Sequence, residues 1–436
     1  MTYSEAMAFI ESIPKFSPAA IVEGDEPMFG LDSIRYLLHL LGDPQKKLHY
    51  VHVGGTNGKG STVAFMASIL KTAGYKTGIY TSPALERFTE RIRVNGEDIP
   101  EDDLGRLTGV VYQAYRQMLE EGKTAPTEFE IVCSVAFLYF LEQGCDIVLL
   151  EVGLGGRLDA TNIIDHPEIA MITTISRDHT ELLGDTLELI AGEKAGIIKA
   201  GCDVVLYPQP ESVRAVFAEV CAEKHAVLHD AVIPAGTKQF SLEGQVFDLT
   251  IGDAAFTDLH IGLLGNYQIN NAAMAVNGAI CMRRRGWEIS DEEIREGLAQ
   301  ASWPGRFELM KKEPAIIVDG GHNEEGARAL RESLLRYFPE GGICFVTGVL
   351  ADKAYDRMMG QTMDLAARYF TVTPPNPRAL PAEDLAEWFR ERGAEAEACC
   401  SIEEALDQAV AAAGPEGVVC VFGSLYYLGA VRKHLA

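Results

Sequence analysis

One segment constrains the fold more than any other: a short apolar run that ends in a glycine-rich turn and leads into a helical pattern. The segment reads LHYVHVGGTNGKGSTVAFMASIL, with Gly54 and Gly55 directly after the apolar residues. Such an order points several backbone N–H groups and the positive end of a helix dipole at one spot, which suits a polyphosphate. The predicted phosphate-binding residues are Gly55, Thr56, Asn57, Gly58, Lys59, Gly60 and Ser61.

The loop departs from the common P-loop pattern at two positions. G-x-x-x-x-G-K-[ST] requires glycine at position 53 and a hydroxyl at position 60, whereas this chain has Val53 and Gly60. A turn that only joins a strand to a helix is the alternative. Four glycines and Lys59 between a buried strand and an amphipathic helix argue against that alternative, and Lys59 suits the β- and γ-phosphates as a point charge.

Short apolar, β-branched runs alternate with helical stretches, which predicts an α/β fold with a parallel sheet covered by helices. The predicted strands are His49–Val53, Thr77–Tyr80, Cys145–Val152, Ile169–Ile175 and Asp203–Leu206, then Ala315–Asp319, Ile343–Val349, Tyr369–Thr373 and Gly417–Phe422. Helices are expected at Ser61–Thr72 and Glu128–Gln143. The stretch Ala226–Leu259 has alternating polar and apolar residues and predicts a small antiparallel insertion.

A chain of 436 residues is too long for one ordinary core, so two domains are expected. The segment Gly297–Arg306 contains Trp303-Pro304-Gly305, where Pro and Gly break the preceding helix before the α/β pattern restarts. We therefore expect a first domain at residues 1–300 and a second at residues 301–436.

Composition and charge exclude several classes of protein. A formal net charge of −25 leaves no basic surplus for nucleic acid phosphates, and no run approaches the ~18 apolar residues of a membrane span. The first residues carry Glu5 and no basic region before an apolar stretch, so we expect no signal peptide. The nine cysteines are scattered without a C-x-x-C pair and partner histidines, which argues against a zinc site. Reduced thiols, a cytoplasmic location and a monomer are the expectations.

Two further segments carry groups suited to a metal. Glu151 ends an apolar strand in DIVLLEVGLGGRLDATN, where a carboxylate would reach Mg²⁺ at the carboxyl edge of a sheet; a solvated charge is the alternative. A dinucleotide fingerprint fails there because its third glycine would be Leu158. His179 follows Asp178 after the next strand, and a structural histidine is the alternative. Asn271, at the start of an alanine-rich helix, could equally be a helix cap.

These motifs together resemble the folylpolyglutamate synthase and dihydrofolate synthase branch of the Mur ligase superfamily, in its bacterial form. G-T-N-G-K-G-S-T is similar to the family's loop, in which a glycine also separates the lysine from the hydroxyl residue. L-L-E-x-G-L-G-G-R-x-D-A-T-N, I-x-x-D-H-x-x-x-L-G, E-K-A-G-I-I-K and G-x-x-Q-x-x-N-A-x-x-A follow in order. The resemblance implies a Mur-ligase-like central P-loop domain and a smaller Rossmann-like C-terminal domain.

Carried over by motif, the resemblance implies the site. Metal ligands would be Ser82, Glu151 and His179; catalytic residues would be Lys59, His179 and Lys194. Lys194 would carry a carbamate, since an ammonium cannot ligate Mg²⁺; an unmodified surface ion pair is the alternative. Further nucleotide contacts would be Asn271, Arg306 and Asp319. Folate would meet Thr127, Glu128, Phe129, Glu130, Leu158, Asp159 and Ala160, and glutamate would meet His322 and Ser424. The second domain reads D-G-G-H-N where the family usually has D-G-A-H-N, with Gly321 as the departure.

The resemblance implies an ATP- and Mg²⁺-dependent ligase that adds L-glutamate to reduced folates, and also converts dihydropteroate to dihydrofolate, through an acyl phosphate. A ligase for a UDP-muramoyl peptide is the nearest alternative, and it would be expected to carry an extra N-terminal domain before the strand at His49. A P-loop switch or binding module fits the loop alone, but it would not need a second α/β domain with Asp319 and His322. The motifs serve both folate activities.

Overall fold

The computed structural model describes residues 1–14 and 30–435 and divides the chain into two compact units. The first unit comprises Met1–Ile233, Leu249–Phe256 and Asn271–Gln300, and the second comprises Pro234–Asp248, Thr257–Asn270 and Ala301–Ala436. Two segments before residue 300 thus cluster with the second unit. The expected boundary between residues 300 and 301 stays a prediction.

The first unit is built on an eight-stranded sheet with the order β4-β3-β2-β5-β1-β6-β7-β8. Its strands are β1 (Tyr50–Gly54), β2 (Thr77–Tyr80), β3 (Ile92–Val94), β4 (Glu97–Asp98), β5 (Ile147–Glu151), β6 (Ile169–Ile172), β7 (Asp203–Leu206) and β8 (Val227–Asp230). The six strands from β2 to β8 in this order are parallel. The predicted parallel sheet is therefore confirmed for these strands, but β3 and β4 add two antiparallel strands at one side of the sheet that were not predicted.

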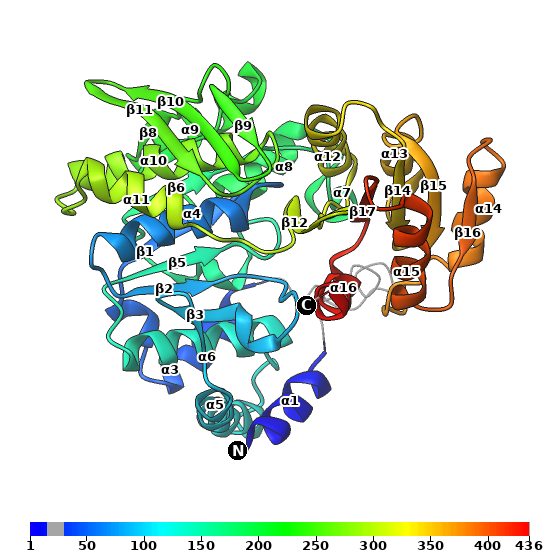
Figure 1. Ribbon diagram of the computed structural model, residues 1–436. Coiled ribbons are helices and arrows are strands. Elements are labelled where there is room, and N and C mark those ends of the chain that lie inside the picture. The colour runs from blue at the N-terminus through cyan, green and yellow to red at the C-terminus, as the bar shows by residue number, and fades with distance from the viewer. Residues whose placement is uncertain (15–29, 436) are drawn as a thin grey trace. The chain divides into compact units, whose positions relative to one another are not determined.

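Helices cover both faces of this sheet (Figure 1). They are α1 (Tyr3–Ser12), α3 (Asp32–Leu40), α4 (Lys59–Thr72), α5 (Glu101–Glu120), α6 (Glu128–Glu142), α7 (Thr180–Leu183), α8 (Leu187–Ala195), α9 (Glu211–Lys224), α10 (Gln268–Arg284) and α11 (Asp291–Gln300). Short 3₁₀ turns are η1 (Pro44–Lys47), η2 (Phe88–Arg91) and η3 (Ala160–Ile163). One apolar core joins Tyr50 and Leu150 to α1, α3, α5 and α6, and a second surrounds β6, β7, α8 and α9. Because strand residues alternate between faces, Val51 and Val53 point away from the face of Tyr50.

The predicted antiparallel insertion is partly wrong. Its first residues form β8, which is parallel to β7 in the main sheet. The rest forms a separate three-stranded sheet of β9 (Gln239–Ser241), β10 (Gly244–Ile251) and β11 (Ala254–Ile261), in which β9 and β10 are antiparallel. β8 is an edge strand with half-exposed residues, so its pattern does not differ from that of an antiparallel strand.

The second unit contains a six-stranded sheet with the order β12-β13-β17-β14-β15-β16. Its strands are β12 (Glu308–Lys312), β13 (Ala315–Val318), β14 (Ile343–Thr347), β15 (Ala366–Thr371), β16 (Ala396–Ala398) and β17 (Val418–Phe422). Its helices are α12 (Glu324–Tyr337), α13 (Tyr355–Gly360), α14 (Ala382–Arg390), α15 (Ile402–Ala413) and α16 (Leu428–Leu435), with the 3₁₀ turn η4 (Leu425–Tyr427). All strands are parallel except β12, and a buried core around Phe345, Tyr369 and Phe422 lies on the sheet.

Among the helices that the structure describes, none is both long and apolar enough to cross a membrane.

Candidate functional site

The glycine-rich loop leaves the sheet at its carboxyl edge, between β5 and β6. In the register of the strands, Val53 lies opposite Glu151 and Gly54 lies opposite Ile172. The loop, the carboxylate of Glu151 and the residues after β6 therefore meet at one edge. Ligands of parallel α/β sheets bind at such carboxyl ends.

Two loop glycines combine a positive φ with a close neighbouring side chain. Gly55 has φ +137°, and a Cβ there would lie 1.9 Å from Oγ1 of Thr173. Gly58 has φ +87° and is the N-cap of α4, and its Cβ would lie 2.5 Å from Oδ1 of Asn271. Positive φ is easy only for glycine, so the loop needs these residues for both backbone and space. The structure also brings the predicted Asn271 against the loop.

Residues after β6 hold the loop in place. The N–H of Thr56 donates to the carbonyl of Thr174 at 2.7 Å, and the N–H of Asn57 donates to the hydroxyl of Thr174 at 3.4 Å. The Thr56 hydroxyl donates to the carbonyl of Ser176 at 3.2 Å. Thr174 and Ser176 were not predicted from the sequence, although polar residues directly after a buried strand were a usable signal. Gly60 and the buried Ser61 lie in the first turn of α4.

Two lysines converge on one carbonyl of the loop. Nζ of Lys59 donates to the carbonyl oxygens of Gly55 and Thr56 at 3.2 and 3.0 Å, and Nζ of Lys194 donates to the Gly55 carbonyl at 2.9 Å. Lys194 is buried at the end of α8. Burial, with the charge of Lys59 as a second cause, lowers the pKa of Lys194 to about 7. A substantial fraction of Lys194 is therefore a neutral amine near neutral pH. The alternative of an ion pair on the surface is wrong, because the side chain is buried.

Glu151 and Ser82 lie together at the same edge. Glu151 is the last residue of β5 and is 6% exposed, and its Oε2 accepts the backbone N–H of Ser82 at 3.3 Å. The buried carboxylate of Glu151 and the hydroxyl of Ser82 are oxygen donors of the kind that Mg²⁺ prefers, so these two residues fit the implied metal. His179 has φ 51° as the N-cap of α7, and its side chain is 42% exposed. Its predicted place among the ligands stays a prediction.

The predicted folate-side segment begins α6, and part of it has a structural task. Thr127 and Glu130 form a reciprocal capping box, with Glu130 Oε2 accepting the Thr127 N–H at 2.7 Å. Oε1 of Glu130 accepts the Ile34 N–H at 3.1 Å, and burial raises the pKa of Glu130. Glu128 is paired with Arg91 at 2.5 Å. Thr127 and Glu130 therefore shape the helix start, whatever else they contact.

Phe129 and Asp159 approach each other around Gly153. A Cβ on Gly153 would lie 2.7 Å from the Phe129 ring and 3.2 Å from Oδ2 of Asp159. Asp159 Oδ2 accepts the N–H groups of Gly153 and Leu154 at 3.0 and 2.9 Å. Burial raises the pKa of Asp159, although these hydrogen bonds favour its charged form. The half-buried Leu158 and the buried Ala160 flank it.

A buried chain of hydrogen bonds continues from Asp159 into the sheet. The Thr161 hydroxyl donates to Asp159 Oδ1 at 2.5 Å, and Nε2 of His52 lies 2.9 Å from the same hydroxyl. Nδ1 of His52 has no hydrogen-bond partner among the described residues. Burial, and secondarily the charge of Lys199, lowers the pKa of His52 to about 3. His52 is therefore neutral, and sequence reasoning missed it because a histidine inside a strand carries no motif.

The second unit gathers its predicted residues around Gly320, after β13. Oδ2 of Asp319 accepts the Phe307 N–H at 2.8 Å and the Tyr267 hydroxyl at 2.7 Å, and Oδ1 accepts the Gly321 N–H at 2.7 Å. A Cβ on Gly320 would lie 2.2 Å from Nη1 of Arg306. Asp319 thus organises the loop that positions Arg306.

Two more predicted residues lie at carboxyl ends of strands in this unit. Nδ1 of His322 lies 2.8 Å from the Gly320 carbonyl. Ser424 follows β17, the parallel neighbour of β13, and its hydroxyl accepts the Tyr426 N–H at 3.3 Å. The two residues therefore lie on adjacent loops of one sheet edge.

Comparison with known proteins accounts for both units. The family model of the Mur ligase middle domain matches residues 53–279, and that of the Mur ligase glutamate ligase domain matches residues 305–425. The chain is 37% identical to the dihydrofolate synthase/folylpolyglutamate synthase of Bacillus subtilis over 99% of each chain.

Solved structures give the same result. The folylpolyglutamate synthase of Mycobacterium tuberculosis complexed with ADP matches with a TM-score of 0.90 at 27% identity, over 100% of this chain and 98% of that one. An FPGS–AMPPCP–folate complex matches with a TM-score of 0.85 at 32% identity over 100% of both chains. The chain therefore belongs to the folylpolyglutamate synthase and dihydrofolate synthase family of the Mur ligases.

Proposed function

We propose that this chain is an ATP-dependent ligase that joins the amino group of L-glutamate to the carboxylate of a reduced folate, and that it also converts dihydropteroate to dihydrofolate. The observation that carries the proposal is the loop between β1 and α4, with Lys59, Lys194 and Glu151 at one sheet edge, in a chain that matches this family over 99% of its length. The relatives solved with ADP or with AMPPCP and folate support the choice of substrates.

ATP would lie with its phosphates on the loop from Gly55 to Ser61. The first N–H groups of α4 and the ammonium of Lys59 would hold them, and Asn271 beside Gly58 would meet the nucleotide. Arg306 has the planar guanidinium that pairs with a phosphate through two hydrogen bonds. Asp319 would act through the loop it organises.

Ser82, Glu151 and His179 would hold magnesium. Bound magnesium would neutralise charge on the phosphates, which a chain of net charge −25 needs from local groups. The carboxylate of Glu151 and the hydroxyl of Ser82 are suitable donors, and a carbamate on Lys194 would add a further oxygen.

The environment of Lys194 supports the proposal that it carries a carbamate. A neutral amine attacks CO₂, an N–C bond forms, and one proton leaves to solvent. The lowered pKa of Lys194 supplies the neutral amine near pH 7. We expect activity to fall in CO₂-free buffer and to recover with bicarbonate, and ¹³C-labelled bicarbonate to give a carbamate signal that Lys194→Gln lacks. A wild-type protein without that signal would contradict the carbamate.

The chemistry requires activation, because a carboxylate has no usable leaving group. The folate carboxylate attacks the γ-phosphorus of ATP, the bond to the β–γ bridging oxygen breaks, and ADP leaves. The glutamate nitrogen then attacks the acyl carbon, the carbon–oxygen bond to phosphate breaks, and phosphate and a proton depart. Lys59 and Arg306 would stabilise charge on the transferring phosphoryl group. The pterin would lie near Phe129, Asp159 and their neighbours, and glutamate near His322 and Ser424.

The proposal is tested by phosphate release from Mg-ATP with glutamate and one of three acceptors: tetrahydrofolate, dihydropteroate or a UDP-muramoyl peptide. Release with both pterins is the expected result. Phosphate release with tetrahydrofolate alone would show that the proposed dihydrofolate synthase activity is wrong. Release with the peptide alone would overturn the folate assignment. We further propose a monomer in the cytoplasm that needs neither nucleic acid nor membrane; light scattering tests the first point.

A further inference from the structure

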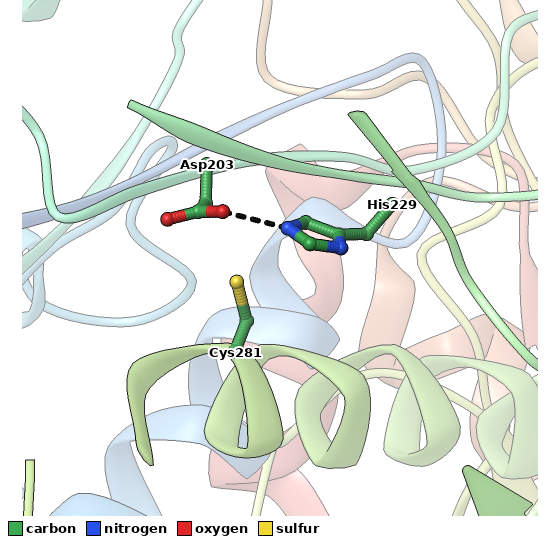
Figure 2. A group of neighbouring side chains, drawn as sticks. All are labelled: Asp203, His229 and Cys281. Atoms are coloured by element: carbon green, nitrogen blue, oxygen red, sulfur yellow. Dashed lines mark hydrogen bonds and ion pairs between the residues drawn. The ribbon is translucent and has the colours of Figure 1, made fainter. Parts of the chain in front are cut away.

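A carboxylate, an imidazole and a thiol from three distant segments meet in the first unit (Figure 2). Asp203 begins β7, His229 is in β8, and Cys281 lies near the end of α10. One ligand atom from each lies within 4.8 Å of the other two. Figure 2 shows Sγ of Cys281 pointing from its helix toward the other two side chains.

Strand register explains why two of these groups share a face. Asp203 lies opposite Val227, and Val205 lies opposite His229 in the parallel pairing of β7 with β8. Because side chains alternate with a period of two, Asp203 and Val205 point to the same side, so His229 is a diagonal neighbour of Asp203. Cys281, which is 3% exposed, completes the group from the helix.

Neighbouring charges already orient the carboxylate. Oδ1 of Asp203 lies 2.6 Å from Nε2 of His229, while Oδ2 accepts from Nη1 of Arg285 at 2.9 Å. Nε of Arg285 in turn donates to Glu168 at 2.9 Å. Arg285 therefore fixes one carboxylate oxygen and leaves the other toward His229 and Cys281. The charges of Asp203, Glu168, Arg285, a Cys281 thiolate and a divalent cation would together sum to zero.

We propose that Asp203, His229 and Cys281 bind zinc or a divalent cation of similar softness, with a water as the fourth ligand. Thiolate, imidazole and carboxylate are the donors that zinc takes in proteins, and a thiolate selects against magnesium. Tetrahedral zinc needs ligand atoms about 3.3 to 3.8 Å apart, so the His229–Asp203 pair opens slightly and Cys281 moves in. The zinc–sulfur bond forms as the thiol proton leaves to solvent. No short motif links these residues, so the lack of a C-x-x-C pair does not bear on them.

This site is separate from the phosphate loop. Asn271, which contacts the loop at Gly58, lies ten residues before Cys281 on α10. At 1.5 Å per residue this corresponds to about 15 Å along the helix axis. Zinc would instead tie the edge strand β8 to β7 and α10, so stabilisation of the fold is its expected effect.

The test uses the full chain, freed of metal and held in excess Mg²⁺, with Co²⁺ or Zn²⁺ added alone. Tetrahedral cobalt bound to a thiolate gives intense visible bands and a near-ultraviolet charge-transfer band. We expect one equivalent of Co²⁺ to give both, Zn²⁺ to abolish them by displacement, and Zn²⁺ to raise the Tm by about 3 °C or more. A wild-type spectrum without the charge-transfer band would overturn the proposal and leave only the contact between His229 and Asp203.

Variants locate the ligands. Cys281→Ser should remove the charge-transfer band. His229→Gln should weaken metal binding by more than about 100-fold, since loss of a residue that only hydrogen-bonds to a ligand already costs about 10- to 100-fold. Cys400→Ser, which changes the exposed cysteine, is the matched control and should bind as the wild type does. A band that survives Cys281→Ser, or disappears in Cys400→Ser, would overturn the assignment. Circular dichroism of each variant separates loss of binding from loss of folding.

Discussion

In the first sheet, the edge formed by the carboxyl ends of the strands and the edge formed by their amino ends carry different groups. At the carboxyl edge, loop glycines with positive φ lie beside Lys59 and Lys194, which donate to the carbonyls of the loop, and Glu151 accepts a backbone N–H. At the amino edge, polar and charged side chains pair with one another: Nδ1 of His49 lies 2.9 Å from Glu168, and Arg285 bonds to Glu168 and Asp203 at 2.9 Å each.

The direction of the strands explains the difference. At the carboxyl edge β1, β6 and β7 each lead through a loop into the N-terminus of a helix, so donors for an anion gather at that edge. The amino edge receives the chain from helix C-termini and satisfies its charges with its own ion pairs. The first edge is therefore suited to binding phosphates, and the second contributes mainly to stability. Each prediction below tests that division.

The largest effect is expected from removing the loop lysine. Lys59→Ala should lower glutamate-dependent phosphate release by about 10³-fold, because a charge aimed at the transferring phosphoryl group is lost. Lys71→Ala, at the exposed end of the same helix, is the control and should keep full activity. Similar rates for both variants would remove Lys59 from the site.

Replacing glycine by alanine should lower the free energy of unfolding more at the carboxyl edge than at the amino edge. Gly55→Ala combines φ +137° with a Cβ 1.9 Å from Thr173, so we expect a loss of at least about 3 kcal/mol and no ATP binding. Gly201, just before β7, has φ +70° but open space around its Cβ position, so Gly201→Ala should cost only about 1 kcal/mol. Denaturant unfolding and nucleotide titration measure both. Equal costs would mean that backbone conformation alone decides, and not the crowding at the carboxyl edge.

The central parallel strands were predicted well, because each is a short apolar run followed by polar or turn-forming residues. β2 and β7 begin and end at the predicted residues, and β1 and β5 differ by a few positions. The antiparallel β3 and β4 were missed because they are only three and two residues long. The placement of β8 was missed because a half-exposed edge strand has the same pattern whether it pairs parallel or antiparallel.

The site was predicted where one segment carries its own chemistry, and missed where tertiary contacts create it. The loop at Lys59 has a motif, whereas Thr174, which holds the loop, follows a strand more than a hundred residues later. His52 and the group of Asp203, His229 and Cys281 depend on burial and strand register, which no local pattern encodes. The burial that lowers the pKa of Lys194 is likewise a property of the fold.

Between the two edges, buried His52 should make stability depend on pH. Its pKa is lowered from 6.5 to about 3, so below pH 6.5 this histidine binds a proton in the unfolded chain but stays neutral in the folded chain. This contribution to stability is complete above pH 6.5 and is lost as the pH falls, by about 2 kcal/mol at pH 5. His52→Gln should lose correspondingly less stability between pH 7 and pH 5. The exposed histidine variant His225→Gln should keep the wild-type slope; if His52→Gln keeps it too, another group carries the dependence.

The smallest effect is expected from the ion pairs of the amino edge. Arg285→Leu removes the bonds to Glu168 and Asp203, and such partly exposed pairs contribute about 1 kcal/mol. The loss should shrink in 1 M salt, where screening acts within about 3 Å, and phosphate release in zinc-free buffer should not change. Arg284→Leu, at the exposed neighbouring position, should alter neither quantity. If Arg285→Leu reduced turnover while Arg284→Leu did not, the amino edge would be coupled to the phosphate loop, and the route would be α10, which carries Asn271 near one end and Cys281 near the other.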